Sequence, residues 1–168
     1  MGYTHYWKIK KPFKDIEKGE KLFKQAVEAT RKCIDKVPAE IPIIQYGFDW
    51  TKMQQVLLNE GKAPFKLCGG DGKGEPEFTD TLVRFNGDAS CDNDHETFSI
   101  SIGDSGFDFC KTARKPYDVA VCIALICFSK YFGDDFNYSS DGDISEGEEG
   151  WKMAKEITKK YFKYGTAE

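Results

Sequence analysis

The longest apolar run in the chain constrains its fold most, because it must lie in the middle of a core. It covers Val119 to Phe128 and continues through Ser129 to Phe132. Its residues are apolar almost all round a helical wheel, which is typical of a helix that is buried on every side. Pro116 precedes the run, where a first helical position accepts proline. We therefore expect a central helix that begins near Pro116.

The segment that leads into this helix is rich in cations. Phe107 to Cys110 has the pattern of a short strand, and Lys111, Arg114 and Lys115 follow it. The amino end of a helix carries free backbone N–H groups and a partial positive charge, and both favour an anion. We therefore predict an anion-binding pocket at the start of the central helix.

Six residues are the candidate ligand-binding residues of this pocket. Lys111 and Arg114 would contact the anion, and Thr112 would donate a hydrogen bond. Asp118, in the first helical turn, would cap the helix or orient the cations, and the aromatic residues would supply a stacking wall. The alternative interpretation is a basic surface turn without a ligand. The six candidates are His5, Lys111, Thr112, Arg114, Tyr117 and Asp118.

Length and charge narrow the classes of partner. A chain of 168 residues is expected to form a single globular domain over residues 1–168. The net charge of −4 conceals an uneven distribution: residues 1–36 hold ten Lys or Arg, and residues 134–149 hold seven acids and no base. An acidic protein lacks the charge pattern of a general nucleic-acid binder. A local pocket for an anionic small molecule remains compatible with this charge.

The six cysteines are scattered and do not form a metal motif. No CxxC pair is present and the chain has only two histidines, so neither a structural zinc site nor any other metal or cofactor is expected. Lys8 and Lys10 interrupt the first apolar residues, so we expect no secretory signal peptide. The central run is shorter than the roughly 20 residues of a membrane span. We therefore expect a cytoplasmic protein with reduced thiols and no membrane partner.

The remaining patterns predict a mixed fold. Helical spacing marks residues 15–36 and 146–164, and loosely alternating or β-branched residues mark several strands. A short strand at 42–47 and a short helix at 50–59 are weaker predictions. Together these elements indicate an α+β fold with a mostly antiparallel sheet of about five strands covered by three main helices. The predicted strands are 2–9, 79–86, 96–102, 107–110 and 136–139.

Three local motifs resemble known sites and fail in detail. Residues 69–74 are rich in glycine, like a phosphate-binding loop. In that loop the lysine is followed by Ser or Thr, whereas Lys73 is followed by Gly74, so a flexible hairpin or loop is predicted. Residues 141–147 have a glycine one place too late for a calcium loop, which favours a solvated turn. Cys110 beside Lys111 could be a reactive thiol, although no assured histidine partner accompanies it.

Four motifs resemble a family of uncharacterised proteins of bacteriophages and bacteria. They begin at Gly2 (GYTHYW), His95 (HETF), Phe109 (FCKTARKPYD) and Ser139 (SSDG). The resemblance brings no established activity, fold or cofactor. It implies a phage accessory protein that interferes with host defence, by binding a host protein or by sequestering a signalling nucleotide. The positions it singles out are His5, His95, Glu96, Lys111, Thr112, Tyr117, Asp118, Ser140 and Asp141.

Three functions are compatible with these observations. The first is a binding protein that holds an anionic small molecule, such as a nucleotide, at the amino end of the central helix. The second is an inhibitor that contacts a host protein through the acidic surface of residues 134–149. The third is a hydrolase that uses His5 or His95 together with Asp118 or Asp141.

Overall fold

Strand β1 (Thr4–Ile9) lies in the middle of a three-stranded antiparallel sheet. The computed structural model describes residues 3–42, 62–141 and 149–164. β7 (Gly106–Lys111) pairs with one edge of β1, and β8 (Phe136–Ser140) pairs with the other. The alternating aromatic and β-branched residues of β1 suit a strand that has both edges paired. β1 therefore organises the sheet.

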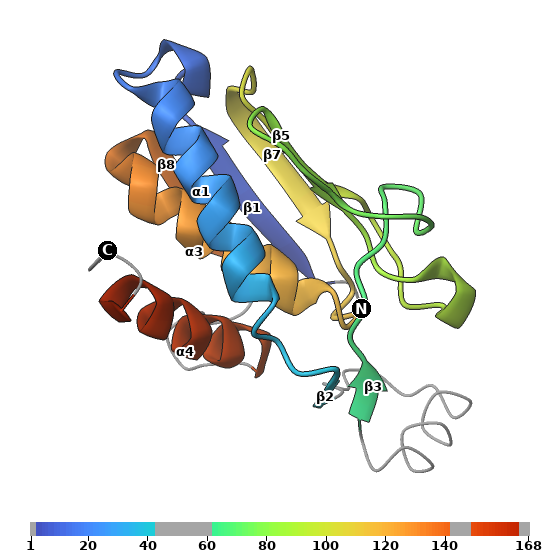
Figure 1. Cartoon of the computed structure of the whole chain (residues 1–168). Coiled ribbons are helices and arrows are strands. Elements are labelled where there is room, and N and C mark those ends of the chain that lie inside the picture. The colour runs from blue at the N-terminus through green and yellow to red at the C-terminus, as the bar shows by residue number, and fades with distance from the viewer. Residues whose placement is uncertain (1–2, 43–61, 142–148, 165–168) are drawn as a thin grey trace.

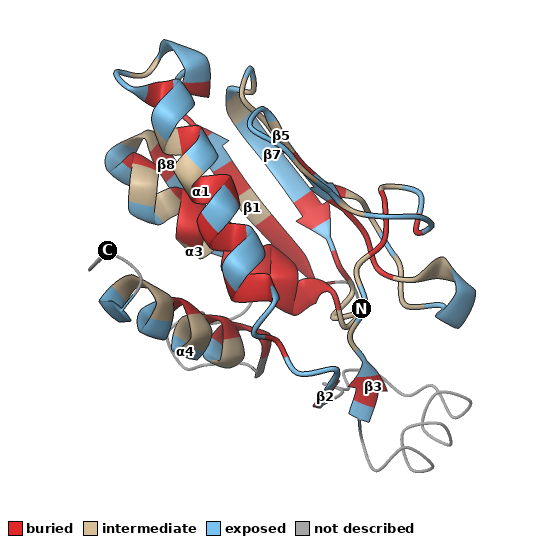
Figure 2. Ribbon diagram, in the orientation of Figure 1, coloured by how far each residue is buried: buried red, intermediate tan, exposed pale blue. Residues whose placement is uncertain are grey.

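Three helices lie on one side of this sheet (Figure 1). They are α1 (Gly19–Ile34), α3 (Asp118–Phe132) and α4 (Glu149–Tyr164). α3 packs against both α1 and α4. Because it has helices on both sides and the sheet beneath, nearly all its residues are buried (Figure 2), as its all-round apolar sequence predicts.

Two smaller antiparallel sheets complete the described part of the chain. One contains β2 (Glu40–Pro42) and β3 (Lys62–Pro64); the other has the order β4 (Glu77–Phe78), β5 (Leu82–Phe85) and β6 (Phe98–Ser101). Short 3₁₀ turns occupy Phe13–Asp15, Ala89–Cys91 and Gly133–Asp135. The rings of Trp7 and Phe98 lie 5.3 Å apart, so the β4–β6 sheet shares the core with the main sheet.

The α+β fold class and its three main helices are confirmed, and every strand pairing among the described residues is antiparallel. The eight strands described there are divided among three sheets. Residues 69–74 form a turn, as predicted. The predicted helix at 50–59 and most of the predicted strand at 42–47 lie outside the described residues. None of the described helices is both long and apolar enough to cross a membrane.

Candidate functional site

The site lies at the end of the main sheet where β1 begins and where β7 and β8 end. His5 and Ser140 face each other across the β1–β8 pair, so their side chains leave the sheet on the same side. That side is the one that α3 covers, because His5, Trp7 and Ile9 alternate inward along β1 and are all buried. The register therefore brings a histidine and a serine together under the first turn of α3.

Three side chains form a continuous hydrogen-bonded chain. His5 Nδ1 lies 2.5 Å from Ser140 Oγ, and His5 Nε2 lies 2.5 Å from Asp118 Oδ1. His5 is completely buried and Asp118 is almost so, whereas Ser140 is half-buried. The serine is thus the end of the chain that is closest to solvent.

Asp118 is a buried carboxylate that its surroundings keep ionised. Burial raises the pKa of Asp118, but the charge of His5 and hydrogen bonds from His5, Thr112 and Cys122 lower it more, so the pKa lies below its usual value. The Thr112 hydroxyl donates to Oδ1, and the Cys122 thiol donates to Oδ2 over 3.5 Å. The position of Asp118 in the first turn of α3 also favours a negative charge.

The charge on Asp118 fixes the roles of the two histidine nitrogens. An ionised carboxylate only accepts hydrogen bonds, so the proton between His5 and Asp118 belongs to His5 Nε2. In the neutral ring, Nδ1 then has a free lone pair and accepts the hydroxyl proton of Ser140. This is the hydrogen-bonding pattern of a serine activated by a general base, with an acid that orients the base.

The start of α4 closes the site from a third side. A methyl group added at Gly150 would lie 2.6 Å from Asp118 Oδ2, so the α4 backbone passes directly over the carboxylate. The rings of Tyr3 and Trp151 meet the His5 ring edge to face at 5.1 and 5.5 Å. Trp151 Nε1 donates to the Tyr3 hydroxyl over 3.2 Å. These contacts hold the imidazole in one orientation.

The basic turn between β7 and α3 has an unusual backbone. Ala113 and Arg114 both have positive φ angles, 50° and 57°, in the region that disfavours a Cβ atom. The Arg114 guanidinium lies over the Tyr3 ring, 4.1 Å from its centroid. Lys115 turns away and contacts Asp92, with its Nζ 3.5 Å from Asp92 Oδ2.

The structure brings together three of the six predicted site residues. His5, Thr112 and Asp118 meet in the buried chain, and Arg114 lies beside it over Tyr3. Lys111 is exposed and alternates with buried Cys110, so its side chain leaves β7 on the opposite face of the sheet from His5. The carboxylate of Asp118 occupies the helix start where an anion was predicted, and Asp118 N–H and Ala120 N–H already donate to the carbonyls of Lys115 and Tyr117.

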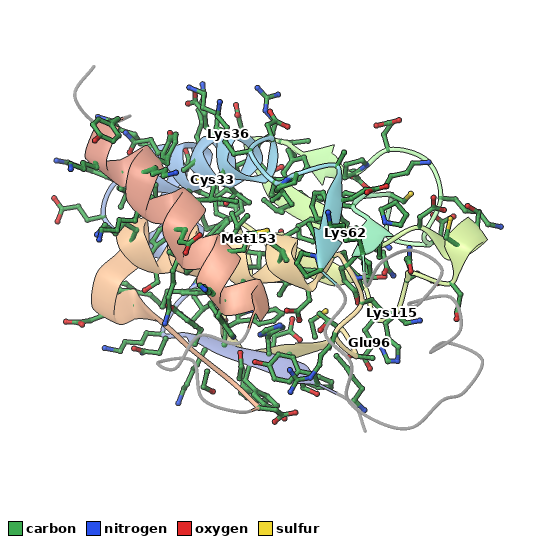
Figure 3. All side chains as sticks on the ribbon, turned by 90° about the horizontal axis from the view of Figure 1, so that it is seen from below. Cys33, Lys36, Lys62, Glu96, Lys115 and Met153 are labelled. Carbon is green, nitrogen blue, oxygen red and sulfur yellow. The ribbon has the colours of Figure 1, made fainter. Side chains whose placement is uncertain are left out.

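Tyr117 and Lys111 instead belong to a second cluster that joins β7 to the segment before β6. The Tyr117 hydroxyl donates to the Glu96 carbonyl over 2.6 Å, and Lys111 N–H donates to Glu96 Oε2 over 2.7 Å. His95 Nδ1 lies 2.7 Å from the Lys111 carbonyl oxygen. Figure 3 shows Glu96 and Lys115 at the same end of the molecule. The His95 ring contacts a backbone carbonyl, its backbone N–H and C=O contact the Asn86 side chain, and it does not join His5.

Cys110 does not have the environment of a reactive thiol. It is completely buried, and its thiol donates to the Glu96 carbonyl over 3.4 Å. Burial raises the pKa of Cys110 to about 12, so the thiolate that a nucleophile requires does not form near neutral pH. All six cysteines are free, as the sequence predicts, and five of them are buried.

Sequence reasoning missed two residues of the site as candidates. Ser140 belongs to one of the four motifs, but only the β1–β8 register reveals its contact with His5. Cys122 follows Asp118 by four positions on α3, and this spacing places the two side chains on one helical face. The sequence shows this spacing, but Cys122 lies in an apolar run whose pattern predicts core residues only.

Asp141 is the one described residue of the predicted solvated turn at 141–147. Its Oδ1 accepts the Tyr6 hydroxyl over 3.0 Å, and its Oδ2 accepts Thr4 N–H over 3.1 Å. These bonds attach the end of β8 to β1. Residues 142–148, which carry three of the seven acids of the predicted acidic surface, lie outside the described residues.

No protein-family model, curated protein or solved structure matches the chain. The functional conclusion therefore depends on the geometry of the site.

Proposed function

We propose that the protein is a serine hydrolase in which Ser140 is the nucleophile, His5 the general base and Asp118 the residue that orients and stabilises His5. The observation that carries the proposal is the chain of two 2.5 Å contacts from Ser140 through His5 to Asp118. It supports the third of the functions that the sequence allows. The sequence also allows His95 to act with Asp118 or with Asp141, and no contact in the structure supports either pair.

The proposed reaction follows the direction of the hydrogen bonds from Ser140 through His5 to Asp118. Ser140 Oγ attacks an electrophilic carbonyl carbon or phosphorus atom while its proton passes to His5 Nδ1. Asp118 stabilises the imidazolium that forms, because its carboxylate already accepts the Nε2 proton. His5 then returns the proton to the leaving group, and water releases the product from Ser140 by the same steps in reverse.

The surroundings of the chain fit this role better than a purely structural one. A buried carboxylate is a weak source of stability, because its desolvation offsets most of the attraction to its hydrogen-bond donors. Here the carboxylate has additional donors, the histidine is held between two aromatic rings, and the serine is the most exposed of the three residues. A buried carboxylate whose environment shifts its pKa in this way is a typical sign of a functional site.

A fluorophosphonate probe tests the nucleophile without knowledge of the substrate. An activated serine displaces fluoride from phosphorus, and its proton is taken up by the base, which leaves a covalent phosphonyl group on the protein. We expect one probe per chain, located at Ser140 by peptide mass mapping. Ser139 is the matched control, because it neighbours Ser140 but is exposed on the other face of the sheet.

The variants make the outcome decisive. Ser140→Ala should abolish labelling, Ser139→Ala should retain it, and Asp118→Asn should slow it by about 10³–10⁴-fold because the amide holds the wrong tautomer of His5. Folding of each variant is checked by circular dichroism. Absence of labelling at Ser140, with no turnover by the native protein of carboxylic esters or phosphoesters, would reject the proposal.

A second candidate function is the binding of an anionic small molecule, such as a nucleotide, beside the same site. The observation that favours it is the Arg114 guanidinium, which a strained turn holds over the Tyr3 ring. Strained backbone often accompanies a binding site. The resemblance to phage proteins would make this a cytoplasmic protein of an infected host that sequesters or cleaves a signalling nucleotide.

A thermal-shift screen with linear and cyclic nucleotides tests this second function. A nucleotide at 100 times its dissociation constant should add about 2.7 kcal/mol to the unfolding free energy. Arg114→Ala should remove the shift, and Lys130→Ala, at the far end of α3, should leave it intact. A shift of equal size in both variants would show that the nucleotide does not bind at Arg114, which would contradict this second function.

A further inference from the structure

We propose that His5, Asp118 and Cys122 form a zinc-binding site that switches the proposed serine chain off. The three side chains are buried, and their ligand atoms lie within 4.8 Å of one another. His5 comes from β1, and Asp118 and Cys122 lie one turn apart on α3. The regulatory part rests on the proposed function; the metal site rests on the geometry alone.

The distance between Cys122 and Asp118 already suits a tetrahedral zinc ion, and the other two distances would each change by less than about 1 Å. Cys122 Sγ lies 3.5 Å from Asp118 Oδ2 and 4.0 Å from His5 Nε2. Bonds of about 2.0–2.3 Å to zinc imply ligand-to-ligand distances of about 3.3–3.6 Å in a tetrahedron. The 2.5 Å contact between His5 and Asp118 is a direct hydrogen bond, so this pair would separate by about 0.8 Å to admit the ion.

The ligand types and the charge select the metal. Imidazole nitrogen and thiolate sulfur favour Zn²⁺ over Mg²⁺ or Ca²⁺, which prefer oxygen atoms. One thiolate and one carboxylate neutralise the two charges of the ion, so the loaded site has no net charge, as a buried position requires. Thr112 already donates to the carboxylate and Ser140 contacts the second nitrogen of His5, which supplies the outer hydrogen bonds that metal ligands need.

Metal binding has a defined proton balance. The Cys122 thiol loses its proton to solvent, and the His5 proton moves from Nε2 to Nδ1 as Nε2 binds the ion. His5 Nδ1 then donates to Ser140 Oγ and no longer accepts its proton. The serine loses its base, so zinc and nucleophilic reactivity exclude each other at this site.

Access to the site is through Asp118. Its side chain keeps 10% of its exposure, whereas His5 keeps none. The carboxylate would thus meet the ion first and deliver it to the histidine and the thiol behind it.

Cobalt(II) gives a readout that does not depend on activity. The protein is treated with a chelator, freed of it and titrated with Co²⁺ while the near-ultraviolet thiolate-to-cobalt band is recorded, and zinc is then added to displace the cobalt. We expect one equivalent per chain, a thiolate band and a higher melting temperature with zinc. Cys122→Ala should lose the band. Cys127→Ala, a buried cysteine on the same helix, is the matched control and should keep it.

The outcomes separate this inference from the proposed function. Absence of the band, or a band that persists in Cys122→Ala, overturns the metal site even if Ser140 reacts with the probe. A band that depends on Cys122 supports the metal site even if Ser140 proves unreactive. Where Ser140 does react, zinc should suppress labelling of the native protein and not of Cys122→Ala; suppression of both to the same extent would overturn the switch.

Discussion

At the scale of single residues, the site depends on how closely neighbouring groups pack against the Asp118 carboxylate as well as on the chemistry of those groups. Asp118 contacts a histidine, a threonine and a cysteine, and the backbone at Gly150 passes close to its Oδ2. A glycine is required there because any Cβ atom would overlap the carboxylate. The beginning of α4 therefore contributes to the site without a functional side chain of its own.

Replacement of Gly150 by alanine should test this packing. The new methyl group would lie 2.6 Å from Asp118 Oδ2, so the chain must shift, and we expect the unfolding free energy to fall by about 1–3 kcal/mol. Gly103→Ala is the control, because nothing lies within 4 Å of the added atom there. Equal stability of the two variants in urea denaturation would show that α4 does not press on Asp118.

At the scale of elements, the helices and strands could be predicted from local patterns, but their pairing could not. The apolar run that became α3 and the amphipathic periodicity of α1 and α4 are properties of short windows. The contact of His5 with Ser140 depends on the register of two strands 135 positions apart, which no local pattern contains. For this reason Ser140 could be singled out by a motif, but its contact with His5 could not be predicted from the sequence.

The turn that joins β7 to α3 is the element whose backbone departs most from what its residues prefer. Ala113 and Arg114 are consecutive residues with positive φ, although the sequence offers no glycine there. Each costs about 1–2 kcal/mol relative to the right-handed region. The contacts on either side, between Thr112 and Asp118 and between Arg114 and Tyr3, hold the turn in this form.

Replacement of Ala113 by glycine should relieve part of this cost. Glycine removes the Cβ clash at φ 50° and adds chain entropy to the unfolded state, so we expect a net gain of about 0.5 kcal/mol in unfolding free energy. Ala124→Gly, in the buried middle of α3, should instead lose about 1 kcal/mol or more. Chemical denaturation compares the two variants, and a loss of similar size at Ala113 would contradict the strained turn.

At the scale of the whole molecule, packing within the α1, α3 and α4 layer raises the pKa of a partly buried tyrosine. Tyr131, at the end of α3, packs against Phe162 of α4 at 5.8 Å between ring centroids. Burial, with a smaller contribution from neighbouring groups such as Tyr161, raises the pKa of Tyr131 to about 12. The folded protein therefore holds this proton at pH values where an unfolded chain has lost it.

Stability should consequently decline in alkaline solution. The contribution of Tyr131 is fully present below about pH 10, the value of an unfolded tyrosine, and is lost as the pH rises through about 12. Tyr131→Phe should flatten this decline in melting temperature, since phenylalanine has no proton to lose. Tyr164→Phe is the control, because Tyr164 is 68% exposed. The same alkaline slope in Tyr131→Phe and in the native protein would exclude this cause.

The central position of β1 has a consequence for how the protein is made. Its two hydrogen-bonded neighbours are β7 and β8, which a ribosome synthesises more than a hundred residues later, so the strand that leaves the ribosome early must wait unpaired for them. His5 likewise meets Ser140 only after β8 has emerged. A nascent chain therefore has neither its main sheet nor the contact between His5 and Ser140, and the site is complete only after translation has passed β8.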